Sequence, residues 1–375
     1  MENLELNGAA RASFWRGRRV VVTGHTGFKG SWLTLWLGRL GALVTGVSLP
    51  PMTTPSLFAA ARIDTLCKSR FLDIRDSSGL ADLIRAAQPE IVFHLAAQPL
   101  VRAGYRDPLT TFETNVMGTV HLLEALRRLG VTRVAVMVTT DKVYRDAESP
   151  VPHGEDDPLG GHDPYSASKA ASEMIIESYR RSYLSAQAVA VASARAGNVI
   201  GGGDWSEDRL IPDAVRAWQG GKPLTVRRPA AVRPWQHVLE PIFGYLILAQ
   251  RLWERPELAG AYNIGPGAAE TVRVRDLVDL ACAAYGEGTT NYGDGSEGPH
   301  ESAWLALDAA KVKRDLGISH VWTLVEAVRR TMFWYRAQRD GADARELCIA
   351  DICSFESDIG RPGAEADNAA VKIRR

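Results

Sequence analysis

The chain has 375 residues, 46% of them hydrophobic, and its 44 lysines and arginines balance its 44 aspartates and glutamates. This balance leaves no overall positive charge to attract nucleic acid or an anionic membrane, so we expect a small-molecule partner. No run of eighteen or more apolar residues suggests a membrane span, and the length suits one large α/β domain with a smaller lobe.

Residues 1–13 hold two glutamates before the first arginine and no apolar stretch, so we expect a flexible tail and not a secretory signal. The four cysteines show neither a CxxC spacing nor a nearby histidine pattern (Cys67, Cys282, Cys348 and Cys353). They predict no disulfide framework and no metal site, and they suit a cytoplasmic protein.

Five short apolar runs rich in β-branched residues recur through the first half of the chain: Arg19–Thr23, Leu43–Val47, Ile91–Ala96, Val134–Val138 and Val189–Ala192. Amphipathic stretches separate them, which predicts a doubly wound α/β fold whose parallel sheet is covered on both faces. We assign this Rossmann-type domain mainly to residues 14–197. Glycine-rich loops and helices such as Val274–Tyr285 predict a smaller C-terminal lobe, mainly residues 198–350, with some strands returning to the large domain. Residues 356–375 predict a second flexible tail.

The first run leads directly into a glycine-rich loop, Gly24-His-Thr-Gly27-Phe-Lys-Gly30, and then into the helical stretch Ser31–Arg39. One glycine permits a tight turn, one lets the backbone approach a pyrophosphate and one allows close helix packing, while the helix N-terminus stabilises the anion. An ordinary tight turn is the alternative, but the strand before and the helix after favour a dinucleotide cofactor. Its predicted contacts in this loop are Gly24, Thr26, Gly27, Phe28, Lys29 and Gly30.

The residues that usually select between NAD and NADP leave the choice open. The second run ends in Gly46-Val-Ser48-Leu, which offers neither a carboxylate for a ribose nor an arginine for a 2′-phosphate. Two further segments can contact the cofactor or can equally be surface loops. They are Asp73 and Ile74 near the adenine, and Leu95, Ala96, Ala97 and Gln98 near the nicotinamide.

A tyrosine and a lysine lie four residues apart in Pro164-Tyr165-Ser-Ala-Ser168-Lys169, which opens a predicted helix, so both side chains share one face. A nearby ammonium stabilises a phenolate. We therefore expect a lowered pKa for Tyr165 and a role as base toward an alcohol, with both residues also touching the cofactor. Chance explains such a pair poorly in a chain with ten tyrosines.

The fourth run is followed by Thr140-Asp141-Lys142, a hydroxyl, an acid and an amine in consecutive positions where a catalytic loop is expected. The chain uses eight lysines against thirty-six arginines, yet Lys29, Lys142 and Lys169 all lie within candidate site motifs. A desolvated lysine can act as a base, which an arginine cannot easily do. A surface Asp–Lys turn is the alternative.

At these residues the chain resembles the CDP-glucose 4,6-dehydratases, a family of extended short-chain dehydrogenases that act on sugar nucleotides. The resemblance covers nearly all of residues 14–335. Longer motifs also carry it: Phe14-Trp-Arg-Gly17, Pro55-Ser-Leu-Phe58, Ala97-Gln-Pro-Leu-Val-Arg102, Thr114-Asn-Val-Met-Gly118, Arg195-Ala-Gly-Asn-Val-Ile-Gly-Gly-Gly-Asp-Trp205, Arg233-Pro-Trp-Gln-His-Val-Leu-Glu-Pro241 and Pro299-His-Glu301. The related dTDP-glucose dehydratases have Asp-Glu where this chain has Asp141-Lys142.

The resemblance implies NAD as cofactor and a cycle without net redox change. Tyr165, aided by Lys169 and Thr140, would take the proton of the sugar's 4-hydroxyl while hydride passes to NAD. Lys142 would then remove the hydrogen on carbon 5, and Asp141 would protonate the departing 6-hydroxyl. The stored hydride would return to carbon 6, which requires that the reduced cofactor stays bound.

The resemblance also implies residues that hold CDP-glucose. Arg233 is the best candidate for a clamp on the diphosphate, because its planar fork matches phosphate oxygens. The other candidates are Asn198, Arg209, His237, His300 and Glu301, of which His300 can equally be a loop histidine. The segments Thr110–Leu129 and Tyr165–Leu184 correspond to helices that pair across a dimer in such enzymes. The resemblance therefore implies a homodimer or a dimer of dimers. It also implies a role in deoxysugar biosynthesis for the lipopolysaccharide O-antigen.

Two departures from the family pattern are Val143 and Arg145, where a more polar run is expected around Tyr144. The alternatives are another sugar-nucleotide 4,6-dehydratase, a 4-epimerase, or a non-catalytic NAD-binding protein. An epimerase has no need of the Asp141–Lys142 couple, and a non-catalytic protein has no need of Tyr165 and Lys169. The choice of cytosine as the base depends on the resemblance alone.

Overall fold

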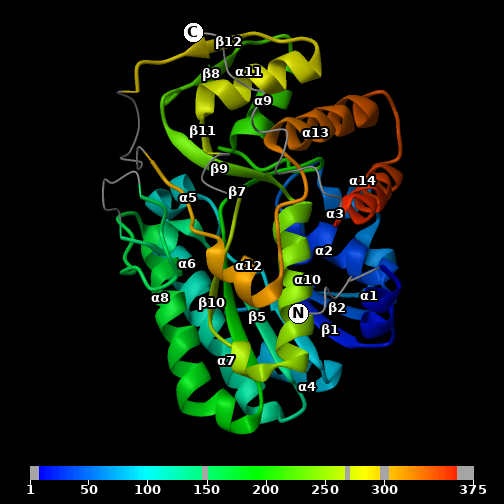
Figure 1. Cartoon of the computed structure of the whole chain (residues 1–375), viewed down its shortest axis with the longest axis vertical. Helices are drawn as coiled ribbons and strands as arrows, with labels where there is room; N and C mark the ends of the chain where they lie inside the picture. The colour runs from blue at the N-terminus through cyan, green and yellow to red at the C-terminus, as the bar shows by residue number, and fades with distance from the viewer. Residues whose placement is uncertain (1–7, 146–150, 267–270, 296–303, 361–375) are drawn as a thin grey trace.

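The structure is a computed structural model that describes residues 8–145, 151–266, 271–295 and 304–360. Its centre is a seven-stranded sheet in which every pairing is parallel (Figure 1). Across the sheet the strands are β10 (Ala261–Ile264), β6 (Ala190–Ala196), β5 (Val134–Thr140), β4 (Ile91–His94), β1 (Arg19–Thr23), β2 (Leu43–Ser48) and β3 (Lys68–Phe71). The predicted doubly wound sheet is confirmed, and its edge strands β3 and β10 are additions to the predicted runs.

Helices cover both faces of this sheet, because alternate residues of a strand point to opposite sides. Val20 and Val22 belong to one apolar cluster, shared with α2 (Phe28–Arg39) and α10 (Leu239–Glu254). Val21, between them, belongs to a second cluster, shared with α4 (Ser77–Ala87), α7 (Gly118–Leu129) and α8 (Pro164–Tyr179). The sheet is therefore the middle layer of three.

Shorter helices complete the large domain. They are α1 (Gly8–Trp15), α3 (Leu57–Ala60), α5 (Val101–Arg106) and α6 (Pro108–Phe112), with the single turns η1 (Ile63–Leu66), η2 (Glu113–Met117), η3 (Asp141–Val143), η4 (Arg180–Leu184), η5 (Ser185–Gln187) and η6 (Pro256–Leu258). Helix α1 begins at Gly8, inside the segment expected to be a tail. None of the helices in the described part of the chain is long and apolar enough to cross a membrane.

The smaller lobe stands over one end of the large sheet (Figure 1). It contains a three-stranded sheet of β11 (Thr271–Arg273), β9 (Val232–His237) and β7 (Asn198–Ile200), and a pair of β12 (Thr290–Tyr292) and β8 (Leu224–Val226). Its helices include α9 (Leu210–Gln219), α11 (Val274–Tyr285) and α13 (Leu324–Arg339), while α12 (Ala310–Leu316) packs back on β10. The predicted helix at Val274–Tyr285 is confirmed.

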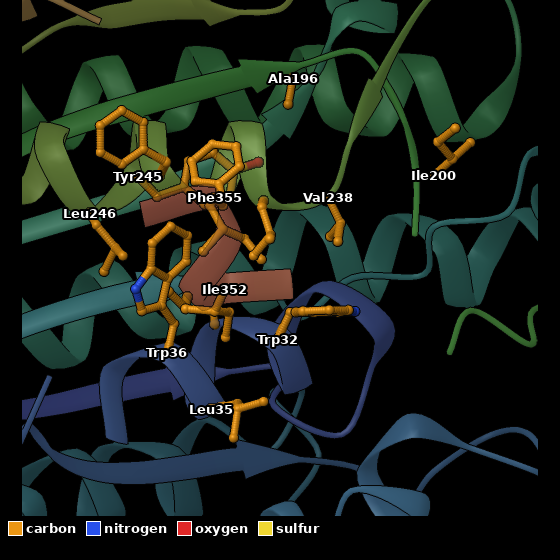
Figure 2. Packing of buried hydrophobic residues seen from close by; sticks show 14 of the residues in the cluster. Trp32, Leu35, Trp36, Ala196, Ile200, Val238, Tyr245, Leu246, Ile352 and Phe355 are labelled. Carbon is orange, nitrogen blue, oxygen red and sulfur yellow. The ribbon is translucent and has the colours of Figure 1, made fainter. Parts of the chain in front are cut away.

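The last described helix, α14 (Ala344–Asp358), packs against the cofactor-side helix α2 of the large domain. The rings of Trp36 and Phe355 lie 5.8 Å apart, edge to face, and Figure 2 shows them together with Ile352 in the core. Trp36 Nε1 also donates to Glu356 Oε1 at 2.8 Å. The helix therefore continues to Asp358, past the point where we expected a polar tail to begin.

Candidate active site

A cavity of about 890 Å³ lies where the carboxyl edge of the large sheet meets the smaller lobe. Its wall combines the end of β5, the start of α8 and the loop after β6 with residues of α9 and β9. Ligands of doubly wound proteins bind at this edge, because the connecting loops gather there. The cavity brings together eight predicted site residues: Lys29, Thr140, Asp141, Lys142, Tyr165, Asn198, Arg209 and Arg233.

Strand β5 ends in the acid–amine pair. Thr140 Oγ1 donates to Asp141 Oδ1 at 2.9 Å and accepts from the backbone N–H of Lys142 at 3.4 Å, which caps η3. Lys142 Nζ lies 3.3 Å from both Asp141 Oδ1 and Asn198 Oδ1. Asp141 is 1% exposed, and its Oδ2 has no hydrogen-bond partner within the described ranges. A buried oxygen without a partner is costly, so this atom is poised to meet a ligand in the cavity.

Tyr165 enters the cavity from the first turn of α8. Asp163 caps this helix by accepting a backbone N–H at 3.0 Å, and Pro164 occupies the first helical position, where no N–H is needed. Burial raises the pKa of Tyr165 to about 12, although a hydrogen bond with Thr140 and the charge of Arg209 oppose this shift. The expectation of a lowered pKa is therefore wrong for this structure, and the phenol keeps its proton at neutral pH.

Lys169 lies one turn further along α8 and is buried against β5. Its Nζ donates to the backbone oxygen of Val138 at 3.1 Å. Burial lowers the pKa of Lys169 to about 8, while the charge of Glu173 opposes the shift. Because this hydrogen bond goes to the strand, the ammonium does not stabilise a phenolate at Tyr165 in the way that the sequence led us to expect.

A buried polar network that was not predicted from the sequence supports the end of β5, where Asp141 and Lys142 lie. Glu173 accepts from Ser193 Oγ at 2.7 Å and from Arg195 Nη2 at 2.9 Å. Arg195 Nη1 also donates at 2.8 Å to the hydroxyl of Tyr144, which lines the cavity. The network joins α8, β6 and the residue that follows η3, so it fixes the direction of the Asp141–Lys142 turn. The eight-residue spacing from Tyr165 to Glu173 on one helix face was the available signal.

The glycine loop joins β1 to α2 as predicted. Gly24 has a φ of 78°, and a Cβ there would lie 2.7 Å from the backbone nitrogen of Ala96. A Cβ on Gly30 would lie 2.0 Å from the Gly24 oxygen, so close backbone packing requires glycine at both positions. Gly27 differs, because a Cβ there would meet nothing closer than the Gly24 oxygen at 3.4 Å. Glycine at position 27 thus keeps open a space that the chain itself does not fill.

That space suits a dinucleotide diphosphate. Helix α2 begins at Phe28 with no side-chain cap and no acidic residue in its first turn. Its first N–H groups and the positive end of its dipole therefore favour an anion beside Gly27. Thr26 has a structural part, since its hydroxyl hydrogen-bonds with Ser48 Oγ at 2.8 Å and ties the loop to the end of β2.

The predicted nicotinamide segment follows β4. Leu95 and Ala96 donate their backbone N–H groups to Thr23 Oγ1 at 3.1 Å each, which places them against the glycine loop. The side chain of Gln98 bonds within the protein, because its Nε2 donates to Thr111 Oγ1 at 2.9 Å. Contacts of these residues and of Ala97 with the cofactor stay predictions.

The predicted adenine contacts lie beyond β3. Asp73 forms an ion pair with Arg75 at 2.7 Å, while Ile74 is 4% exposed and packs beside Gly118. Their contact with adenine stays a prediction.

Four arginines line the lobe side of the cavity: Arg209, Arg227, Arg228 and Arg233. Arg233 on β9 is 7% exposed and Arg209 pairs with Asp204 at 3.1 Å. A guanidinium matches the geometry of phosphate oxygens, so this wall suits the diphosphate of a sugar nucleotide.

His237 belongs to the core and not to the cavity wall. It shares a face of β9 with Arg233 but lies past the end of the cavity, with its ring 4.9 Å from Trp322 and 6.1 Å from Trp32. Burial lowers its pKa to about 3. The predicted substrate contact of His237 is therefore wrong. His300 and Glu301 lie outside the described residues.

A parallel sheet with a glycine loop and a Tyr–Lys helix at its carboxyl edge is the architecture of a short-chain dehydrogenase. Residues 20–265 match the NAD dependent epimerase/dehydratase family. The chain is 45% identical over 351 residues to the CDP-glucose 4,6-dehydratase of Salmonella typhimurium, an alignment that covers 92% of this chain and 98% of the relative. It is 31% identical to the dTDP-glucose 4,6-dehydratase of Streptomyces griseus, with 85% and 94% covered.

Among solved structures, MoeE5 in complex with UDP-glucose and NAD matches with a TM-score of 0.72 and 25% identity, over 85% of this chain and 99% of MoeE5. The chain belongs to the NAD dependent epimerase/dehydratase family, and its cofactor is NAD. The sequence at the end of β2 left the choice between NAD and NADP open, and these matches decide it in favour of NAD.

Proposed function

We propose that this enzyme is a CDP-glucose 4,6-dehydratase, which converts CDP-D-glucose to CDP-4-dehydro-6-deoxy-D-glucose and water. The observation that carries the proposal is the Asp141–Lys142 pair in the cavity wall, linked through Thr140 to the phenol of Tyr165. Oxidation of an alcohol needs only the tyrosine and its lysine, whereas elimination of water needs a further acid and base. The 45% identity to the relative from Salmonella typhimurium supports CDP-glucose as the substrate.

When bound, NAD would supply the hydride acceptor for oxidation at carbon 4 of the sugar and the hydride donor for reduction at carbon 6. Gly27 and the N-terminus of α2 would hold its diphosphate, because Gly27 leaves an open backbone surface and the first N–H groups of α2 have no side-chain cap, while Gly24 and Gly30 allow the close packing of the loop. Leu95 and Ala96 would border it from β4.

Tyr165 takes the proton of the 4-hydroxyl group. Its side chain enters the cavity from the first turn of α8, one turn before Lys169. Thr140, which hydrogen-bonds with both the phenol and Asp141, aligns this hydroxyl in the cavity.

Elimination then uses the end of β5. The ketone at carbon 4 makes the hydrogen on carbon 5 acidic, and the amine of Lys142 removes it. Asp141 gives a proton to the 6-hydroxyl, which leaves as water, and its unpartnered Oδ2 is the atom available for this contact. The ammonium formed on Lys142 returns a proton to carbon 5. Asn198, 3.3 Å from Lys142 Nζ, holds the amine in position throughout.

Incubation with CDP-, dTDP-, UDP- and GDP-glucose tests the proposal, with mass spectrometry to detect the loss of one water without added NAD. We expect that loss with CDP-glucose. Recovery of every sugar nucleotide intact, or formation of a 4-epimer alone, would contradict the proposal. Lys142→Met should abolish solvent exchange at carbon 5, while Lys222→Met, an exposed lysine on the lobe, serves as the matched control.

We also propose a homodimer, alone or paired into a dimer of dimers. Large apolar side chains are exposed on neighbouring elements of one flank, where Figure 1 shows α6 beside α8: Leu109 and Phe112 on α6, Met117 on η2, Met174 on α8 and Tyr183 on η4. An apolar patch of this kind suits a symmetric partner. Light scattering tests it, and Met174→Glu should shift the enzyme toward the monomer.

The product of the proposed reaction is an activated 6-deoxy sugar. We therefore place the enzyme in deoxysugar biosynthesis in the cytoplasm, and its use in lipopolysaccharide O-antigen is a proposal that rests on the resemblance alone.

A further inference from the structure

Arg102 and Asp208 form an ion pair between the large domain and the smaller lobe. Arg102 lies on α5 of the large domain, and Asp208 lies in the loop between β7 and α9 of the lobe. Arg102 Nη1 donates to Asp208 Oδ1 at 2.8 Å, and both residues line the cavity. Their side chains are 35% and 23% exposed, which places the pair where the cavity meets the solvent. The two domains are therefore joined at the rim of the site.

On the large-domain side, the pair is connected to the helix that carries Tyr165. Helix α5 packs on α8, and a Cβ on Gly104 would lie 3.3 Å from the backbone nitrogen of Tyr165. Arg106, one turn after Arg102, adds a longer contact of 3.8 Å to Asp208 Oδ2. Neither arginine pairs with another carboxylate among the residues that the structure describes. Asp208 is thus the acidic partner of this part of the cavity wall.

On the lobe side, the loop that carries Asp208 is held at its base. Arg216 of α9 donates to the backbone oxygens of Trp205 and Ser206 at 2.8 and 2.9 Å. Asp208 follows two residues later with a φ of 58°, in the left-handed region that costs a residue with a side chain some free energy. The ion pair with Arg102 offsets this cost. The position of the loop tip therefore depends on a contact with the other domain.

The proposed reaction needs a site that stays closed from its first step to its last. The oxidised sugar must remain bound until hydride has been returned to it, and closure of a cavity also keeps water from the reacting atoms. Asp208 is followed directly by Arg209, which belongs to the arginine wall predicted to hold the diphosphate. Because a partly exposed ion pair contributes little free energy, it can form and break in every turnover.

We propose that the Arg102–Asp208 pair is a clasp that holds the two domains closed over the bound sugar nucleotide and opens for its entry and release, an inference that rests on the proposed function. Both are positioning residues: they slow the release of the substrate and transfer neither a proton nor a hydride. Loss of one partly exposed ion pair should speed the release by about two- to fivefold.

Isotope trapping measures this release against the reaction. The NAD-loaded enzyme is mixed with radiolabelled CDP-glucose and then with a large excess of unlabelled CDP-glucose, so that labelled product reports the bound substrate that reacted before it was released. Arg102→Gln and Asp208→Asn remove the charges, and asparagine keeps the tolerance for a left-handed backbone. In both variants the ratio of release to reaction should rise by about two- to fivefold. Arg102→Lys, which keeps the charge, should lie closer to the wild type.

Arg62→Gln is the matched control, because Arg62 forms a 2.8 Å pair with Asp343 and neither residue lines the cavity. It should trap as much substrate as the wild type. Salt gives a readout that a merely structural role would not move, since about 1 M salt screens a partly exposed pair. The difference between the wild type and the two clasp variants should then disappear. Equal trapping in low salt, or a difference that salt does not reduce, would overturn the clasp.

Hydrogen exchange in the nucleotide-free enzyme separates this proposal from the proposed function. The backbone amides of α5 and of residues 207–209 should exchange faster in Arg102→Gln and Asp208→Asn than in the wild type and in Arg62→Gln. If the wild type does not convert CDP-glucose, the proposed function fails, and this exchange alone decides whether the pair holds the cavity closed. Unchanged exchange in both variants would contradict the clasp.

Discussion

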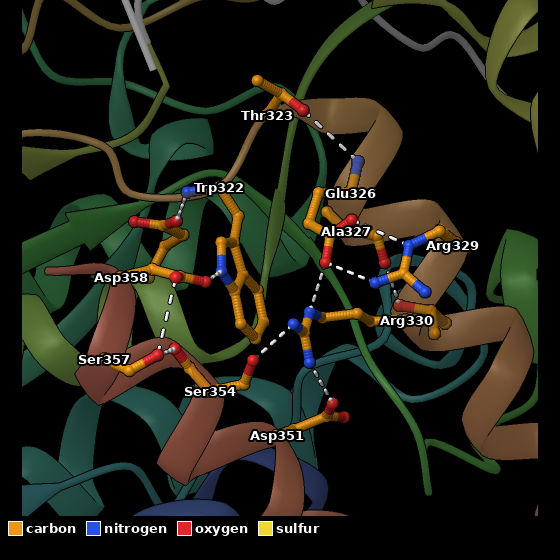
Figure 3. Close-up of polar contacts among 12 residues, drawn as sticks. Trp322, Thr323, Glu326, Ala327, Arg329, Arg330, Asp351, Ser354, Ser357 and Asp358 are labelled. Carbon is orange, nitrogen blue, oxygen red and sulfur yellow. Dashed lines mark hydrogen bonds and ion pairs between the residues drawn. The ribbon is translucent and has the colours of Figure 1, made fainter. Parts of the chain in front are cut away.

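Two charged clusters of this molecule show how differently the same side-chain types can be used. The first cluster is that of the cavity, with Lys29, Asp141 and Lys142. The second joins α13 to α14 around Arg330 (Figure 3). Its guanidinium donates to Glu326 at 2.6 Å, to Asp351 at 3.1 Å and to Ser354 at 2.5 Å, and it lies over the ring of Trp322.

In the α13–α14 cluster every side of the guanidinium has a partner. In the cavity, Asp141 keeps one oxygen without a partner and Lys29 faces mainly other cations. An ionisable side chain whose charge is fully paired keeps its protonation state and its position. A side chain whose charge is only partly paired can exchange a proton with a ligand. The comparison predicts that changes in the first cluster alter rate, and that changes in the second alter stability.

Asp141→Asn should have the largest effect on activity. Loss of the acid should lower kcat by about 10²–10⁴-fold, because general acid catalysis contributes a factor of that size. The free energy of unfolding should change much less, because the amide oxygen of Asn can still accept from Thr140 and Lys142 and only the buried Oδ2 without a partner is replaced. Turnover and thermal melting measure the two effects, and Asp82→Asn on exposed α4 is the control. A variant with a kcat within tenfold of the wild type would exclude Asp141 as the acid.

Arg330→Met should reverse this pattern. It removes three hydrogen bonds to partly buried acceptors and should lower the free energy of unfolding by roughly 2–3 kcal/mol. The kcat of the folded fraction and the KM should not change, because Arg330 is not among the residues that line the cavity. Urea unfolding and steady-state kinetics test this, and a lowered kcat at unchanged stability would show that the two clusters are not independent.

Glu240 makes the stability depend on pH. Burial raises its pKa from 4.5 to about 8, although it accepts the N–H groups of Val321 and Trp322. Between these two pH values the folded protein holds a proton that the unfolded chain has lost, so stability falls as the pH rises through this window. Glu240→Gln should flatten that dependence, measured by urea unfolding at several pH values. An unchanged slope would mean that the carboxyl is ionised in the folded protein.

Arg62→Ala should have the smallest effect. Arg62 pairs with Asp343 at 2.8 Å at the start of α14, but both side chains are well exposed. Water and salt screen such pairs, so the melting midpoint should fall by about 2 °C or less, and by nothing measurable in high salt. A larger or salt-independent loss would mean that this pair anchors α14.

The sequence could predict the strand–loop–helix unit of the cofactor loop because its signals are local. Glycine spacing, the preceding β-branched run and the following helix all lie within about twenty residues. The signals that predicted Thr140–Lys142 and Tyr165 are also local in the sequence. The edge strand β3 escaped prediction, because its burial pattern is mostly exposed and its composition polar.

The contacts of individual side chains were harder to predict from the sequence. His237 and Arg233 share one strand face, and only the positions of Trp32 and Trp322, distant in sequence, decide that one is core and the other cavity wall. The pKa of Tyr165 depends on burial and on where the Lys169 ammonium points, which spacing along a helix does not determine. The ion pair of Glu173 and Arg195 joins two elements that no local pattern connects.

The packing of α14 on α2 has a consequence for how the chain acquires its structure. Trp36, Ile352 and Phe355 share one apolar cluster, although more than three hundred residues separate the first from the others. During synthesis α2 therefore emerges long before Ile352 and Phe355, and its Trp36 face, which also packs against Phe243 of α10, is fully covered only when both later helices are in place. We therefore expect α2, the helix that follows the glycine loop, to reach its final packing late in folding, when α14 joins it.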